Sequence, residues 1–341
     1  MNMHLNTRLA GRRHPGAALL PALLSATLLL MGGLASAQGS APPFPNKPIR
    51  LVVPFAAGGG GDTLARILAD KLRPRLNQSV LVDNKPGASG IIGADIVAKS
   101  PADGYTMLIT TPNLVMTKFM TPKLPYDPLA DLVPVAEVVQ AQLWLAVSTA
   151  RTDAKTLAEF VAQTKAKGEG LFYGSVGPGT TGHLLGFGFV NGSGIKAEHV
   201  AYKGGGPASL ALVSGEITFA VMDYVVLKPQ VDAGKVRLLA TFGTRRSPLV
   251  PAAPTLSEAG YPGLDIYAWA GLFVAAGTPP AVLQRLAAES KAVMADPEVI
   301  ARLLAIGYDP GTLLLGDFAA LVKSDHDRWG EIIKKAGVKL D

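Results

Sequence analysis

Short, apolar, β-branched segments alternate with amphipathic helical segments along most of this chain, and that alternation constrains its fold more than any other feature. Lys47–Pro54 (KPIRLVVP) has the composition of a buried strand, and leucines recur behind it at helical spacing as far as Leu76. The next segments are expected to be a strand at Val80–Val82, a helix at Ile91–Lys99 and a strand at Tyr105–Thr110. A β-α-β-α-β order predicts parallel neighbouring strands joined by right-handed crossovers.

The alternation stops in a Pro-rich stretch from Thr121 to Pro134 and then starts again. Thr156 and Glu159 have the spacing of a capping box, which predicts a helix from there to about Lys167. The other predicted elements are strands at Leu143–Val147, Leu171–Tyr173, His199–Tyr202, Ile217–Met222, Val236–Phe242 and Tyr267–Val274, and helices at Thr180–Phe189, Ala208–Val213, Leu227–Ala233 and from Pro280 to about Lys335. We therefore expect two α/β units, with the second inserted into the first.

The N-terminal segment has the three-part layout of a secretory signal. Three arginines form a basic start, an apolar run extends from Ala17 to Met31, and a small-x-small pattern ends at Ala37. The apolar run is about 15 residues long, which is shorter than a membrane-spanning helix. We expect residues 1–37 to be a signal peptide, cleaved after about Ala37, that directs export.

The composition excludes several classes of protein. The 341 residues include no Cys, so a disulfide framework, a zinc ribbon, an iron–sulfur site and a thiol nucleophile are excluded. The net charge of +6 falls to +3 without residues 1–37, because that segment carries three Arg and no acidic residue. No Lys/Arg block remains, so no nucleic-acid partner is expected.

Three Gly-rich turns each follow a predicted strand and precede a predicted helix, which is where open parallel sheets bind ligands. The turns are Pro54–Asp62, Gly174–His183 and Tyr202–Pro207. Their glycines expose backbone N–H groups at a helix start, where the helix dipole is positive, so each turn suits an anion. Any one of them could be a tight turn without a ligand, but together they predict a cleft for a small carboxylate.

The second turn also has the spacing of a dinucleotide-binding loop, with Gly177, Gly179 and Gly182 in a G-x-G-x-x-G pattern. Such a loop needs an acidic residue at the end of the next strand, whereas Glu198 lies at the start of that strand. Neither a dinucleotide nor any other cofactor is expected.

Catalytic and metal-binding patterns are sparse. The histidines after residue 37, His183, His199 and His326, lack the spacing of a metal pair, so no metal site is expected. Ser175 and His183 could form a nucleophile pair, but no Gly-x-Ser-x-Gly elbow supports it, and a His that bonds its own loop is the simpler interpretation. Asp62 could act as a general base, although its place in the first helical turn fits a cap better.

Eight motifs in the same order make the chain similar to a known family. They are Val52–Asp62 (VVPFAAGGGGD), Asn84–Ala88 (NKPGA) with Gly90 and Ile92-Gly93, Pro101–Tyr105 (PADGY), Leu124–Asp127 (LPYD), Tyr173–Gly179 (YGSVGPG), His199–Gly204 (HVAYKG), Pro254–Pro262 (PTLSEAGYP) and Ala275–Pro279 (AAGTP). The chain resembles the Bug family, the periplasmic solute-binding proteins of tripartite tricarboxylate transporters, from about Pro45 to its C-terminus.

The resemblance implies a two-domain Venus-flytrap fold of type II-like topology, each domain a mixed, mostly parallel sheet flanked by helices. The domains would be residues 45–145 plus 260–341, and residues 146–259. Such a protein binds a small organic carboxylate in the periplasm and delivers it to a two-component membrane permease, as a monomer and without catalysis. The alternatives are a secreted Ser/His hydrolase of small esters and a sensory carboxylate receptor that docks on a membrane kinase.

Carried over by position, the resemblance also implies a ligand site. One carboxylate would meet the Phe55–Gly60 amides, with Asp62 ordering that loop, and the other end would meet Ser175, the following threonines and the Tyr202–Gly204 turn. Asp223 and Thr111 lie at strand ends and are candidates for specificity. The full candidate set is Phe55, Ala56, Gly58, Gly59, Gly60, Asp62, Thr111, Ser175, Gly179, Thr180, Thr181, Tyr202, Lys203, Gly204 and Asp223.

The chain departs from the family pattern at several of these turns. Gly61 stands where the family often has Ser or Thr, and Ala201 replaces a frequent Pro. Pro178 and the Thr180-Thr181 pair replace a commoner polar pattern. These differences leave the expected fold unchanged and leave the identity of the carboxylate open.

Overall fold

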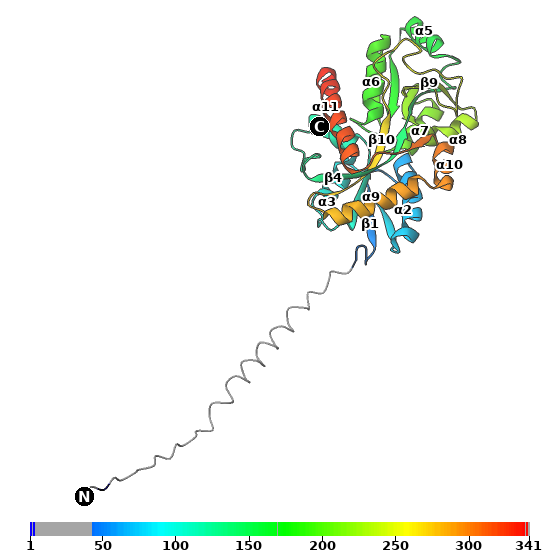
Figure 1. The fold of residues 1–341 in the computed structure, drawn as a ribbon. Helices are drawn as coiled ribbons and strands as arrows, with labels where there is room; N and C mark the ends of the chain where they lie inside the picture. The colour runs from blue at the N-terminus through cyan, green and yellow to red at the C-terminus, as the bar shows by residue number, and fades with distance from the viewer. Residues whose placement is uncertain (2, 4–42, 169, 338, 340–341) are drawn as a thin grey trace. The chain divides into compact units, whose positions relative to one another are not determined.

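Two β-sheets lie in the part of the chain beyond Lys47, and each carries its own helices (Figure 1). The computed structural model describes residues 1, 3, 43–168, 170–337 and 339, so the predicted signal segment lies outside the described residues except at positions 1 and 3. Residues 47–341 form one compact unit. The strand order is β11-β4-β10-β3-β1-β2 in the first sheet and β7-β6-β8-β5-β9 in the second.

The first sheet combines the predicted parallel strands with strands that return from far along the sequence. Its strands are β1 (Ile49–Val53), β2 (Val80–Asn84), β3 (Thr106–Thr110), β4 (Leu132–Ala141), β10 (Ala268–Ala275) and β11 (Tyr308–Pro310). β1 pairs in parallel with β2 and β3, as the β-α-β order predicted. β10 runs antiparallel between β3 and β4, and β11 runs antiparallel to β4.

The helices that pack on the first sheet come from both ends of the described chain. They are α2 (Gly60–Leu76), η1 (Ala88–Gly90), α3 (Ile91–Ala98), α4 (Asn113–Met120), α9 (Pro280–Met294), α10 (Pro297–Ala305) and α11 (Leu315–Ala336). α2 ends where Asn77 adopts a left-handed conformation with φ of 49°, which Asn tolerates better than most residues. We call this sheet and these helices the first lobe.

Several elements of the first lobe were not predicted from the sequence, among them β4 and α4. β4 begins at the end of the Pro-rich stretch, and Pro134 is accommodated because the β4–β10 pairing shifts register beside it. α4 is only eight residues long and begins directly after Pro112. Both elements are short or interrupted, so they give a weak periodic signal.

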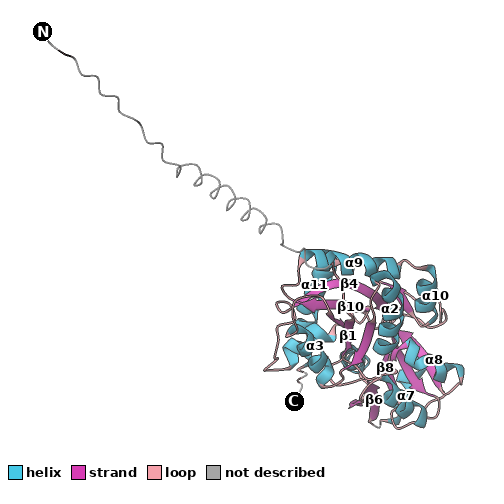
Figure 2. Cartoon of the chain, turned by 90° about the horizontal axis from the view of Figure 1, so that it is seen from below, coloured by secondary structure: helices cyan, strands magenta, loops and turns pink. Residues whose placement is uncertain are grey.

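The second sheet also contains three parallel strands, β6, β7 and β8. Its strands are β5 (Leu143–Ser148), β6 (Leu171–Ser175), β7 (Ala197–Ala201), β8 (Phe219–Asp223) and β9 (Val236–Thr241), and its helices are α5 (Leu157–Lys167), α6 (Thr181–Ser193), α7 (Gly205–Ser214) and α8 (Tyr224–Asp232). β6 pairs in parallel with β7 and β8, whereas β5 runs antiparallel to β8 and β9. We call this sheet and α5–α8 the second lobe; Figure 2 shows α7 and α8 beside β6 and β8.

The predicted capping box at the start of α5 is present with one difference. Thr156 Oγ1 accepts a hydrogen bond of 3.2 Å from the Glu159 amide, as expected. Glu159 Oε2 accepts a hydrogen bond of 2.8 Å from the amide of Lys155 and not from that of Thr156. The Glu side chain therefore reaches one residue further back than a standard box requires.

The chain passes from the first sheet to the second at Gln142, between the end of β4 and the start of β5. β5 pairs along its whole length with strands of the second sheet. The chain returns after Ile266, whose amide still bonds to Phe242 of the second lobe at 2.7 Å. The predicted domain limits of 45–145 plus 260–341 and 146–259 stay a prediction, with the crossings near Gln142 and Tyr267 as the sites to test.

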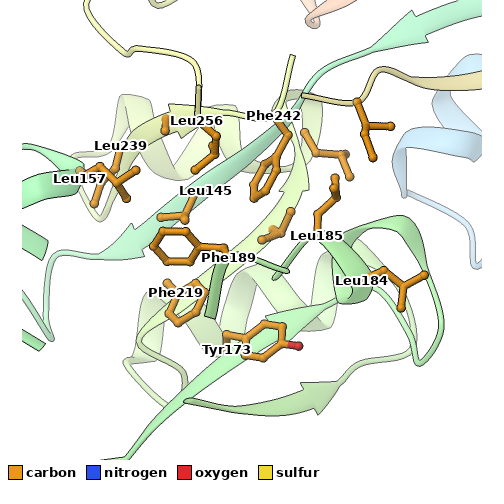
Figure 3. Packing of buried hydrophobic residues seen from close by; sticks show 14 of the residues in the cluster. Leu145, Leu157, Tyr173, Leu184, Leu185, Phe189, Phe219, Leu239, Phe242 and Leu256 are labelled. Carbon is orange, nitrogen blue, oxygen red and sulfur yellow. The ribbon is translucent and has the colours of Figure 1, made fainter. Parts of the chain in front are cut away.

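A cluster of buried aromatic and aliphatic side chains forms the core under α6 (Figure 3). The ring centroids of Phe189 and Phe219 lie 5.9 Å apart in an edge-on arrangement, which the ring quadrupoles favour. Trp329 and Ile333 of α11 pack into the same cluster. The C-terminal helix of the first lobe therefore covers part of the core of the second. Among the described helices, none combines the length and apolar character that a membrane span requires.

Candidate functional site

A cavity of about 100 Å³ lies between the two lobes, where strands end and helices begin. The residues that line it come from the starts of α2, α4, α6, α7 and α8 and from the strands beneath them. They are Phe55, Ala56, Gly59, Gly60, Gly61, Leu64, Thr111, Asn113, Val139, Ala141, Leu143, Val176, Thr180, Thr181, Gly182, Gly204, Gly205, Val221, Met222, Asp223, Val226, Ala268, Trp269, Ala270 and Tyr308.

Five helix N-termini meet at this cavity, and their first N–H groups have no acceptor within their own helices. Two of the glycines at these starts leave no room for a side chain. A Cβ on Gly60 would collide with the Tyr308 hydroxyl, and one on Gly182 would collide with the carbonyl oxygen of Val221. Gly60 therefore lies directly against a side chain and Gly182 directly against main chain.

Asp62 holds the first Gly-rich loop from behind. Its carboxylate is 4% exposed, and it accepts hydrogen bonds from the Gly58 amide at 2.9 Å, Arg66 Nε at 3.0 Å and Asn84 Nδ2 at 3.1 Å. Burial acts to raise the pKa of Asp62, but these hydrogen bonds outweigh it and the pKa is lowered. Asp62 lies outside the cavity wall and is not the cap residue, which is Gly59. Its contacts support the predicted role in ordering the loop.

Asn113 and the Thr180-Thr181 pair connect the lobes inside the cavity. The Thr181 amide donates to Asn113 Oδ1 at 3.3 Å, and Thr180 Oγ1 caps α6 by accepting from the His183 amide at 3.4 Å. Asn113 and Thr181 are 3% and 6% exposed. Asn113 was not among the predicted site residues, although a polar residue just past the predicted strand Tyr105–Thr110 is a usable signal.

Asp223 and Tyr308 lie near the start of α2. Asp223 ends β8 and is half-buried, and its Oδ2 is 3.5 Å from the position of a Cβ on Gly60. Burial raises the pKa of Asp223 to about 6, against a hydrogen bond from its own amide. The sequence analysis missed Tyr308, which the three-residue β11 brings to the cavity by pairing with the end of β4.

Residues 64–338 match the family model described as "Tripartite tricarboxylate transporter family receptor". The chain belongs to this receptor family. It is 32% identical over 307 residues to the protein BugT of Bordetella pertussis, an alignment that covers 89% of this chain and 94% of BugT. The Bug resemblance drawn from the eight motifs is therefore confirmed.

Solved structures agree with the family. The R. palustris protein Rpa4515, solved with adipate, superposes with a TM-score of 0.83 at 32% identity, covering 87% of this chain and 99% of that one. The periplasmic binding protein BugD superposes with a TM-score of 0.81 at 30% identity, covering 87% and 99%. The predicted fold class and the solute-binding family are confirmed, and a receptor of this family is a periplasmic protein.

Nine of the predicted site residues line the cavity of this receptor: Phe55, Ala56, Gly59, Gly60, Thr111, Thr180, Thr181, Gly204 and Asp223. The other six lie outside the wall. Gly58 and Gly179 donate their amides to Asp62 and His183, at 2.9 Å each, and so shape the loops. The Tyr202 hydroxyl donates to Glu216 at 2.7 Å, and Lys203 is exposed. Gly204 is the residue of this turn that lines the cavity, and the ligand contacts expected of Tyr202 and Lys203 stay predictions.

Ser175 is fully buried and does not line the cavity, and its predicted ligand contact stays a prediction. Its Oγ donates to the Gly177 carbonyl at 2.8 Å and lies 2.8 Å from His199 Nε2. The pair expected for a hydrolase, Ser175 with His183, does not form a hydrogen bond, since His183 Nδ1 accepts from the Gly179 amide instead. A His that bonds its own loop, the simpler interpretation, describes His183.

The imidazoles of His183 and His199 stack with their centroids 3.7 Å apart. Burial lowers the pKa of His183 to about 4, and burial together with the charge of His183 lowers the pKa of His199 to about 3. Both rings are therefore neutral at pH 7 and hold the β6–α6 loop. Within the described residues, no cluster of His, Asp and Glu has the arrangement to hold a metal ion.

Proposed function

We propose that this receptor captures a small organic carboxylate in the cavity between its lobes and delivers it to a two-component membrane permease. The observation that carries the proposal is the meeting of five helix N-termini at one cavity. Backbone N–H groups and the positive ends of helix dipoles favour an anion without any basic side chain. The adipate found in the R. palustris relative supports the same class of ligand.

The apolar floor of the cavity complements this chemistry. Strands β4, β5, β8 and β10 contribute aliphatic side chains such as Val139, Leu143 and Val221. A ligand with a short carbon skeleton would bury apolar surface there, at roughly 25 cal/mol per Å². The amides recognise the carboxylate, and the shape of the floor limits the skeleton.

The proposal includes no chemical step. The full burial of Ser175 and its hydrogen bonds with its own loop support binding without catalysis. Export through a signal peptide at residues 1–37, cleavage after about Ala37 and action as a monomer belong to the same proposal. Mass spectrometry of the protein recovered from the periplasm tests the cleavage site directly.

A thermal-shift screen tests the binding function. Organic acids such as succinate, glutarate, adipate, citrate and benzoate are each compared with their methyl esters, which have the same skeleton without the charge. An acid present at 100 times its Kd should stabilise the protein by about 2.7 kcal/mol, and the matching ester should not. If no acid raises the Tm and an ester is hydrolysed, the protein is a hydrolase and the proposal is wrong.

A further inference from the structure

Asp223 is the only charged side chain among the described residues that line the cavity. None of the described residues that line the cavity is a Lys, Arg or His, so the wall offers Asp223 no counter-ion. A carboxylate that loses water without gaining a partner is costly. Asp62 shows the contrast, because three donors satisfy it. A ligand that approaches Asp223 therefore has to supply the positive charge that the protein does not.

The cavity has two chemically different poles. The acidic pole contains Asp223, Gly60 and the Tyr308 hydroxyl, which the contacts around Gly60 bring together. The donor pole contains Asn113, Thr180, Thr181 and Gly182 at the starts of α4 and α6. Gly182 packs on Val221, two residues before Asp223 on β8, so the poles lie roughly 7 Å apart at about 3.3 Å per strand residue.

The helix dipoles also favour an anion at the donor pole over one at the acidic pole. The first turn of α2, at the acidic pole, already contains the carboxylate of Asp62, which opposes the positive end of that dipole. The first turns of α4 and α6, at the donor pole, contain no acidic residue. An anionic group is therefore stabilised more at the donor pole than beside Asp223.

We propose that Asp223 binds a protonated amino group of the ligand while the ligand carboxylate occupies the donor pole. The inference rests on the proposed carboxylate-binding function and narrows it. A zwitterionic amino acid with its two charges at opposite ends of a short carbon chain complements both poles. A dicarboxylate of the same length places its second negative charge against Asp223 and binds less tightly.

Three series of compounds with matched carbon chains test this inference by calorimetry at pH 7.5. The amino acids are γ-aminobutyrate, δ-aminovalerate and ε-aminocaproate; the monocarboxylates are butyrate, valerate and caproate; the dicarboxylates are succinate, glutarate and adipate. In the wild-type protein, the best amino acid should bind at least about tenfold more tightly than the monocarboxylate and the dicarboxylate of its length, because it alone pairs with the Asp223 carboxylate.

Asp223→Asn tests the residue itself with little change of shape. It should lower the affinity for the amino acid at least about tenfold and leave the affinity for the monocarboxylate within about twofold of wild type, because only the amino acid loses an ion pair. Asp232→Asn is the matched control, since Asp232 lies on α8, is 58% exposed and pairs with Lys228 at the surface. It should leave all affinities unchanged.

The outcomes separate this inference from the proposed function. Tight binding of mono- or dicarboxylates with no advantage for the amino acids would overturn the role of Asp223 and leave the carboxylate receptor intact. An equal loss of affinity for all three series in Asp223→Asn would also overturn it, since the effect would not depend on the amino group. If none of the compounds binds to the wild-type protein, both this inference and the proposed function for these skeletons are wrong.

Discussion

The backbone amide of Thr181 donates a 3.3 Å hydrogen bond to Oδ1 of Asn113, and this contact joins the start of α6 in the second lobe to the start of α4 in the first. Both residues line the cavity. A ligand that reaches the donor pole therefore lies beside a bond that exists only while the lobes are together. Binding and lobe contact are coupled at this point, because each stabilises the other.

Asn113→Ala should weaken carboxylate binding roughly fivefold, since it removes about 1 kcal/mol of hydrogen bonding between the lobes. Asn113→Asp keeps the acceptor for Thr181 and adds a negative charge at the donor pole, so it should weaken binding further. Calorimetry with valerate and δ-aminovalerate measures both variants. Wild-type affinity in Asn113→Asp would show that the ligand carboxylate does not reach this pole.

Asp62→Asn should lower the free energy of unfolding by about 1–3 kcal/mol at pH 7, because the carboxylate accepts three hydrogen bonds that an amide cannot fully replace. The folded pKa of Asp62 is lowered, so its contribution is present above the unfolded pKa near 3.9 and is lost as the pH falls further. Urea unfolding at pH 7 and pH 3 measures the difference between wild type and variant, which should shrink at pH 3.

Asp70→Asn is the control for this series. Asp70 lies on the same helix with its side chain 62% exposed, so its loss should change stability by less than about 0.5 kcal/mol. A wild-type to Asp62→Asn difference that stays constant down to pH 3 would contradict the assigned role of the Asp62 charge.

The elements that could be predicted from the sequence are those that depend on interactions between residues close together in the chain. The parallel strands, their helices and the Gly-rich starts of α2 and α6 were predictable, because apolar periodicity and glycine content are local signals. The insertion of β10 between β3 and β4 was not, since it depends on pairing between distant residues. Tyr308 was missed for the same reason.

The predicted site residues that lie outside the cavity wall have a different origin. Ser175, Tyr202 and Lys203 lie in the correct turns, but sequence position does not say which way a side chain points. Ser175 turns into its own loop and Tyr202 turns toward Glu216. The residues that remain at the wall are mainly those whose backbone faces the cavity, and a Gly-rich motif identifies those well.

The stacked histidines should make the receptor less stable in mild acid. Their folded pKa values lie below the ordinary value near 6.5, so the unfolded chain binds more protons as the pH falls from 6.5 toward 4. Stability is full above about pH 6.5 and should fall by up to about 1.4 kcal/mol per pH unit for each ring below it. Urea unfolding at pH 7 and pH 5 measures this slope.

His183→Gln and His199→Gln should each reduce the slope by removing one titrating ring. His326→Gln is the control, because that ring lies beside Asp327 on α11 and outside the stacked pair. If His183→Gln and His199→Gln both lose stability with acid as steeply as the wild type, the pair is not responsible for the acid sensitivity.

Gly182→Ala should disrupt the donor pole at the start of α6. Its Cβ would collide with the main-chain carbonyl of Val221, which cannot rotate away as a side chain would. We expect a loss of about 1–3 kcal/mol in unfolding free energy and weaker binding of valerate, because the start of α6 must move.

Gly206→Ala is the matched control at the start of α7, where a Cβ meets nothing within 4 Å. It should be neutral or stabilise by up to about 1 kcal/mol. Equal stability of the two variants in urea would mean that α6 and β8 tolerate separation, and that Gly182 is not required for the close approach of these two segments.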